Sequence, residues 1–214
     1  KDGVPDYSKN TFDIRFKEYK ILRNKLESFS IDSWPVHEQV DWYLLWAEMN
    51  GYLFNYKVLK PWQRDPAFYK SIWTYKSDVP AHEGPTPHFT VELWQYNFPL
   101  NKKDRIKLLS SLRLIPKFNE EAQTNLTGNA RDLWIAGIRD IEKQSQILED
   151  LNLKSGVAKD KKLVMQIKKA KDSTDDFVKW LKKESSKKKG PSGIGKENYT
   201  WYQQNVHLVP MTWE

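Results

Sequence analysis

The sequence predicts an all-α protein, a multi-helix bundle that contains antiparallel helical hairpins. The first observation is that apolar residues recur at intervals of three and four over long stretches, which is the period of an amphipathic helix. The second is that no internal repeat and no alternation of strand and helix patterns runs along the chain. The third is composition, because 39% hydrophobic and 14% aromatic residues in a chain of 214 are enough for a packed core.

Two helices are expected in the first quarter of the chain. Residues 11–30 place aromatic and aliphatic side chains at helical spacing, with Lys and Arg between them. The second helix is expected to begin at Pro35, since proline suits the first turn. Its apolar stripe consists of Val36, Val40, Leu44, Ala47, Gly51 and Phe54. Trp42 and Trp46 widen this stripe, so we expect the second helix to be buried on more than one side.

The middle of the chain predicts irregular structure. Residues 61–75 are typical of a turn followed by a short helix. Residues 77–101 contain four prolines and are expected to form a long Pro-rich loop, with a short strand at 89–94. Long loops inside compact domains are often lids or rims of functional sites, so this loop is a candidate rim.

Further helices are expected in the second half. A helix opens at Asp104, and Pro116 is expected to break or kink it. Asn129 is expected to cap the following helix, which ends near Leu151. The next stripe steps by four, three, four, three and four: Leu163, Ile167, Ala170, Thr174, Phe177 and Leu181. This seam is typical of a helix that packs on a neighbour, and we expect an antiparallel hairpin with the preceding helix.

The net charge of +7 is concentrated in one segment. Residues 154–189 carry 13 Lys and five acidic residues, whereas the rest of the chain carries 22 basic and 23 acidic residues. Nucleic-acid surfaces usually mix Arg and aromatic residues into such a patch, and this segment contains no Arg. The pattern therefore favours a solvated Lys-rich helix face, and no nucleic-acid partner is expected.

The stretch GPSGIGKE, residues 190–197, approaches the phosphate-binding loop of nucleotide-binding proteins. Glu197 stands where that motif needs a hydroxyl to ligate magnesium, and the stretch follows a Lys-rich helix end rather than a buried strand. We interpret residues 186–196 instead as a Gly/Lys-rich junction between two helices.

Metal or catalytic motifs are weak in this sequence. His37 and Asp41 lie one helical turn apart, and Glu48 is the nearest further ligand on the same helix. The simpler interpretation is a first helical turn whose acids favour the positive end of the dipole. His82 and His88 lie in a Gly- and Pro-rich stretch that could form a cleft rim. Cysteine is absent from the chain, which excludes disulfides, thiol catalysis and Cys-based zinc sites.

Three segments together carry a resemblance to a known family. They are WPVHEQVDWYLLWAEMNGYLFNYKVLKPWQRDPAFY (34–69), NLTGNARDLWIAGIRDIEKQS (125–145) and GPSGIGKENYTWYQQNVHLVPMTWE (190–214), with VELWQYNFPL between them. In this order they resemble the bacterial domain-of-unknown-function 885 (DUF885) family over about residues 30–214. The resemblance implies a largely helical, zinc-dependent metallopeptidase that is often exported, as a periplasmic, lipoprotein or secreted protein.

The resemblance also implies which part of such a protein this chain is. The family's zinc helix, with its His-Glu core, lies downstream of the segment that matches residues 190–214. We therefore expect a single helical domain over residues 1–214, the non-catalytic N-terminal half of such a hydrolase. It contributes no catalytic residue and no metal ligand, and zinc is expected in a downstream half on the same or a separate chain.

Residues are carried over from the resemblance only in the matched segment. Tyr199, Trp201 and Tyr202 are implied as substrate-cleft candidates. The rim histidines His82 and His88 are further cleft candidates, which rest on the loop pattern alone. The resemblance implies a structural helix junction at Gly193, Gly195 and Asn198.

A second hypothesis stays open beside the hydrolase half. The chain can equally be a stand-alone helical module that binds a peptide or protein without catalysis. The substrate, the physiological role and the oligomeric state do not follow from the sequence.

Overall fold

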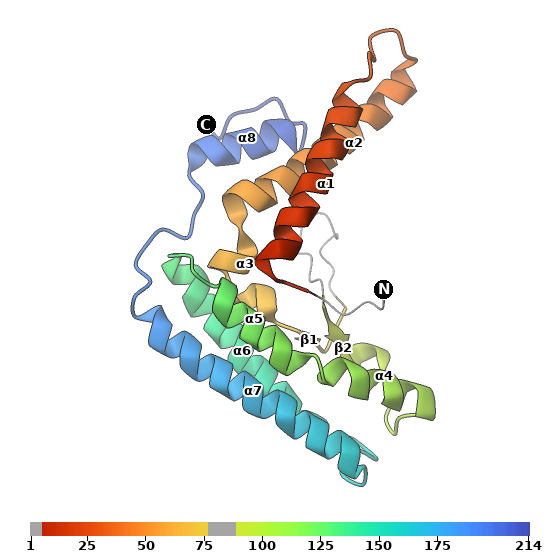
Figure 1. Cartoon of the computed structure of the whole chain (residues 1–214), viewed down its shortest axis with the longest axis vertical. Coiled ribbons are helices and arrows are strands. Elements are labelled where there is room, and N and C mark those ends of the chain that lie inside the picture. The colour runs from red at the N-terminus through yellow and green to blue at the C-terminus, as the bar shows by residue number, and fades with distance from the viewer. Residues whose placement is uncertain (1–5, 77–88) are drawn as a thin grey trace. The chain divides into compact units, whose positions relative to one another are not determined.

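The computed structural model describes residues 6–76 and 89–214. Helices dominate it, and the predicted all-α class is confirmed (Figure 1). The chain divides into two compact units, each built from two separate stretches of sequence. Unit 1 takes the residues up to Tyr7 together with Pro61–Ser192, and unit 2 takes Ser8–Lys60 together with Gly193–Glu214.

Unit 1 contains five of the α-helices and a small sheet. The helices are α3 (Pro61–Arg64), α4 (Lys102–Leu112), α5 (Ile115–Asn125), α6 (Arg131–Leu151) and α7 (Lys161–Ser185). Two short 3-10 turns accompany them, η2 (Pro66–Tyr69) and η3 (Leu93–Gln95). Strands β1 (Ile72–Trp73) and β2 (Val91–Glu92) pair in parallel, with Ile72 opposite Val91. The strand expected within 89–94 is thus present as a two-residue strand.

The break expected at Pro116 is also present. Helix α4 ends at Leu112, and Pro116 lies in the first turn of α5, where its missing N–H costs no helical hydrogen bond. Helix α4 begins two residues before Asp104, because Asn101 caps it by accepting a hydrogen bond from the Asp104 N–H at 2.9 Å.

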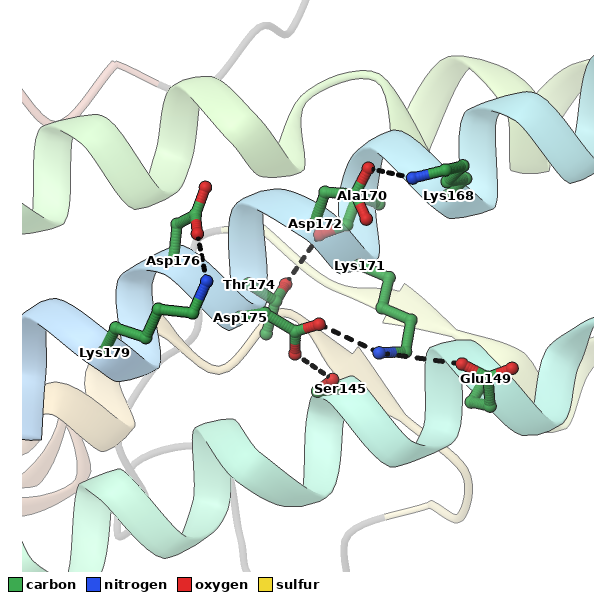
Figure 2. Close-up of polar contacts among 10 residues, drawn as sticks. All are labelled: Ser145, Glu149, Lys168, Ala170, Lys171, Asp172, Thr174, Asp175, Asp176 and Lys179. Atoms are coloured by element: carbon green, nitrogen blue, oxygen red, sulfur yellow. Dashed lines mark hydrogen bonds and ion pairs between the residues drawn. The ribbon is translucent and has the colours of Figure 1, made fainter.

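Helices α6 and α7 form the predicted antiparallel hairpin. The ion pairs between the helices show this direction, because a later residue of α7 pairs with an earlier residue of α6. Lys182 lies 2.6 Å from Glu142, and Lys171 lies 3.6 Å from Glu149. Figure 2 shows this polar edge, where Asp175 accepts hydrogen bonds from both Lys171 and Ser145. Beneath it the seam residues are buried: Leu163, Ile167, Ala170, Thr174, Phe177 and Leu181. The predicted stripe is therefore the core face of α7.

The first residues of the GPSGIGKE stretch pack against the beginning of α6 in unit 1. The Ser192 Oγ accepts hydrogen bonds from the Asp132 N–H at 2.8 Å and the Leu133 N–H at 3.3 Å, so it caps α6 from outside the helix. The prediction that Asn129 caps α6 is wrong. Its side-chain oxygen instead accepts from the N–H groups of Lys189 and Gly190, because the returning chain passes directly over it.

Unit 2 is a smaller group of helices. It contains α1 (Lys9–Glu27), α2 (Val36–Phe54) with a π-helical turn η1 (Asn55–Leu59) at its end, and α8 (Lys196–Asn205). Gly195 precedes α8 with a φ of +82°, a left-handed conformation that a residue with a Cβ rarely adopts. The positive φ explains why Gly195, one of the three predicted junction residues, is a glycine.

Candidate binding surface

Asn50 holds the three helices of unit 2 together. Its side chain is only 2% exposed and uses both ends of its amide. The Asn50 Oδ1 accepts from the Arg23 Nη1 of α1 at 2.9 Å, and the Nδ2 donates to the carbonyl of Asn205 on α8 at 2.8 Å. Because a buried amide with a lost partner is costly, this contact fixes the position of α8 on α2.

Two of the predicted cleft residues are packing residues of this unit. Trp201 stacks on Phe54 with ring centroids 5.7 Å apart, and Tyr202 lies tilted against the same ring at 4.9 Å. Phe54 is 3% exposed, so the two aromatic side chains cover it from α8. His207 contacts the edge of Tyr202 at 4.9 Å. These rings form one aromatic cluster of unit 2, in which only Phe54 is fully buried.

The third predicted cleft residue is different. Tyr199 is 45% exposed, and its hydroxyl accepts a hydrogen bond from Gln203 within α8. At the junction, Asn198 donates from its side chain to the Ile194 carbonyl at 2.8 Å, and Gly193 has no neighbouring atom where a Cβ would stand. The rim candidates His82 and His88 lie outside the described residues.

Helix α2 contradicts the expectation that it is buried on more than one side. Of its 19 residues, Ala47, Asn50 and Phe54 are buried. The first half of the predicted stripe is open, since Val36 is 76%, Val40 49% and Leu44 55% exposed. The stripe is continuous in sequence, but α1 and α8 cover only its second half.

An open apolar groove lies along this exposed half of α2. Its lining residues are Val40, Tyr43, Leu44, Gln204, Leu208 and Pro210, around about 590 Å³ of space. The second wall forms because the chain turns back after α8. The Val209 N–H donates to the Gln203 carbonyl at 3.0 Å, and the Trp213 N–H donates to the Thr200 hydroxyl at 3.1 Å.

The side chains that line this groove are suited to binding an apolar partner. Tyr43 is the one lining residue with an ionisable side chain, and Gln204 supplies the only amide among the lining side chains. Such a surface suits an apolar helical face or an apolar peptide side chain, held by burial of area rather than by charge. It offers no pair of groups for acid–base catalysis.

Zinc ligands are not assembled in the part of the chain that the structure describes. No group of three or more His, Asp or Glu side chains lies close enough there to hold a metal ion. On the exposed first turn of α2, the His37 Nε2 lies 4.0 Å from the Glu38 Oε1. This arrangement is the one expected from the simpler interpretation, an ordinary first helical turn with acidic residues. The described residues thus do not fit a zinc site.

Sequence reasoning missed the groove for a definable reason. Val40 and Leu44 have the spacing of core residues, and spacing does not reveal whether a partner helix exists within the chain. Leu208 and Pro210 lie after the last helix, where no periodicity applies. The one available signal was the high apolar content of α2 on all sides.

Comparisons with family models, curated proteins and solved structures find no match to this chain. Within the described ranges, no helix is long and apolar enough to cross a membrane.

Proposed function

We propose that this chain is the non-catalytic helical half of a zinc-dependent peptidase of the family-885 kind, and that unit 2 docks the zinc-bearing half. The support for the family, and with it for a bacterial, exported protein, is the resemblance of residues 34–69, 125–145 and 190–214. Catalysis and zinc would belong to the other half, while this half would supply helical walls and apolar contacts for an extended peptide.

One observation carries the docking part of this proposal. Helix α2 has an apolar stripe whose exposed half includes Val36, Val40 and Leu44. Covering such side chains contributes about 0.8–1.5 kcal/mol each when half of their surface is removed from water. A continuous stripe of this kind on a groove is typical of a surface that another polypeptide covers.

The groove also favours a second candidate function. A stand-alone module that binds an amphipathic helix would use the same residues, because a helix presents apolar side chains at the spacing of Val40 and Leu44. The two functions differ in whether zinc and peptidase activity accompany the protein.

The test uses the native protein, recovered with an affinity tag from the cells that make it. We expect about one zinc ion per protein and hydrolysis of peptides that stops when a chelator removes the metal. Native material without zinc and without peptidase activity would overturn the peptidase proposal and leave the binding module.

A double substitution tests the surface itself. Val40→Lys with Leu44→Lys places two charges on the groove and is expected to lower zinc content and peptidase activity at least about tenfold. Leu153→Lys is the matched control, since Leu153 is an 83% exposed leucine of unit 1, and it should leave both unchanged. Equal activity in the two variants would remove the groove from the proposal.

A further inference from the structure

A second pocket lies in unit 1, between the end of β1 and one face of α6. It encloses about 370 Å³, which is within the range of small-molecule sites. Lys70, Trp73 and Tyr75 line one side, and Asp140 and Lys143 of α6 line the other. These residues are remote in sequence from the groove of unit 2 and play no part in the proposed function.

Lys70 is held in this pocket with little exposure to water. Its side chain is 13% exposed, and its Nζ lies 4.3 Å from the ring centroid of Trp73. The nearest carboxylate oxygen, on Asp140, is 3.9 Å away, which is too far for a hydrogen bond. An ammonium carries three donors, and among the described residues none of them reaches an acceptor within hydrogen-bond distance.

The balance of charge on the lining side chains is positive. Asp140 is the one carboxylate among them, and it faces both Lys70 at 3.9 Å and Lys143 at 4.0 Å. Two ammonium groups thus share one partner. A partly desolvated cation without full neutralisation attracts an anion into the space beside it.

Trp73 adds an aromatic ring to this pocket. The Lys70 Nζ lies over the ring, and the indole Nε1 is buried away from the open space. Tyr75 stands edge-on to the indole at 6.3 Å and is 63% exposed, which leaves an aromatic surface next to the charges.

We propose that this pocket binds a carboxylate that carries an aromatic or apolar side group. The carboxylate would pair with the ammonium groups of Lys70 and Lys143, and the side group would lie against Tyr75. The C-terminus of a peptide and a free aromatic acid share this chemistry. A phosphate would satisfy the charges but would leave the aromatic surface uncovered.

The test titrates the full chain with N-acetyl-phenylalanine and with its C-terminal amide. The acid is expected to bind with a dissociation constant below about 10 mM, and the amide at least tenfold more weakly, because it lacks the charge. The indole N–H resonance of Trp73, assigned with Trp73→Phe, should shift with the acid. A tetrapeptide ending in the same residue separates the sources: tighter binding indicates a peptide C-terminus, and equal binding indicates a free acid.

Two variants and one control test the residues. Lys70→Met is expected to weaken binding of the acid at least about tenfold, and Lys143→Gln about threefold. Lys143 is 72% exposed, so this variant folds even where the loss of Lys70 disturbs unit 1. Lys168→Gln is the matched control, with an equally exposed side chain on α7 that pairs with Asp172. Equal binding of acid and amide, no binding, or equal losses in Lys143→Gln and Lys168→Gln would overturn the proposal.

Discussion

Asp65 is a partly buried carboxyl group in unit 1, and removal from water makes its charged form unfavourable. It accepts a hydrogen bond from the Ala67 N–H at 2.8 Å at the start of η2. Burial raises its pKa from 3.8 to about 6, and the negative charge of Asp140 adds to this effect. Because the folded pKa lies above the unfolded value, the native state binds the proton more tightly than the unfolded chain does.

The stability of the protein should therefore depend on pH through this residue. Its contribution is fully present below about pH 4 and is lost as the pH rises through about 6. Asp65→Asn keeps an acceptor for the Ala67 N–H but carries no charge. We expect it to raise the free energy of unfolding at pH 8 by about 1–2 kcal/mol and to flatten the pH 4–6 slope.

Urea unfolding at several pH values measures this effect. Asp41→Asn, on the exposed surface of α2, is the control and should keep the wild-type slope. An unchanged slope in Asp65→Asn would mean that Asp65 is ionised at the same pH in both states.

Ser192 replaces the cap that α6 lacks in its own sequence. Ala130 precedes the helix and has no side-chain acceptor, so the N–H groups of Asp132 and Leu133 depend on the Ser192 hydroxyl. Ser192→Ala is expected to cost about 1 kcal/mol of stability and a few degrees in Tm. Ser186→Ala removes an exposed hydroxyl that contacts only the Lys183 carbonyl, and thermal unfolding of this variant should match the wild type.

Among the helices, the sequence predicted the buried face of α7 best and the buried face of α2 least well. The stripe from Leu163 to Leu181 is buried along its length, because α6, α5 and α4 all pack against α7. In α2 the same spacing is buried only where α8 and the Asn50 contact reach it. Helical periodicity thus predicted α1, α2, α6 and α7, while the coverage of each face depended on contacts that periodicity does not encode.

The open half of α2 should tolerate charge without loss of folding. Val40→Lys with Leu44→Lys changes side chains that are 49% and 55% exposed, so we expect the free energy of unfolding to change by less than about 1 kcal/mol. Phe54→Ala, at the buried end of the same helix, is expected to cost about 3–5 kcal/mol. A comparable loss in the double variant, measured by urea unfolding, would show that the groove is part of the core.

The two units differ in how completely they are packed. The largest fully buried side chains in the described residues all belong to unit 1, among them Trp134, Tyr69, Phe177 and Ile141. The helical class and the α6–α7 hairpin could be predicted from periodicity. The division into units could not, because it depends on Asn50 meeting Asn205, which are 155 positions apart.

This difference predicts unequal hydrogen exchange. Amides of α7 lie in the best-packed unit and should exchange at least about a hundredfold more slowly than those of α2, since local opening follows local packing. Hydrogen–deuterium exchange with mass spectrometry compares the helices in one experiment. Equal protection in α2 and α7 would mean that unit 2 is covered more completely than its exposed side chains indicate.

The split composition of unit 2 has a consequence for the order of synthesis. Residues 8–60 leave the ribosome early, but α8, which covers Phe54 and binds Asn50, is made only after the whole of 61–192. At about 5–20 residues per second, that interval is on the order of ten seconds. Throughout this interval α2 has only α1 as a partner from its own unit, so Phe54 and Asn50 stay without α8 and the growing chain presents a target for holding chaperones until α8 emerges.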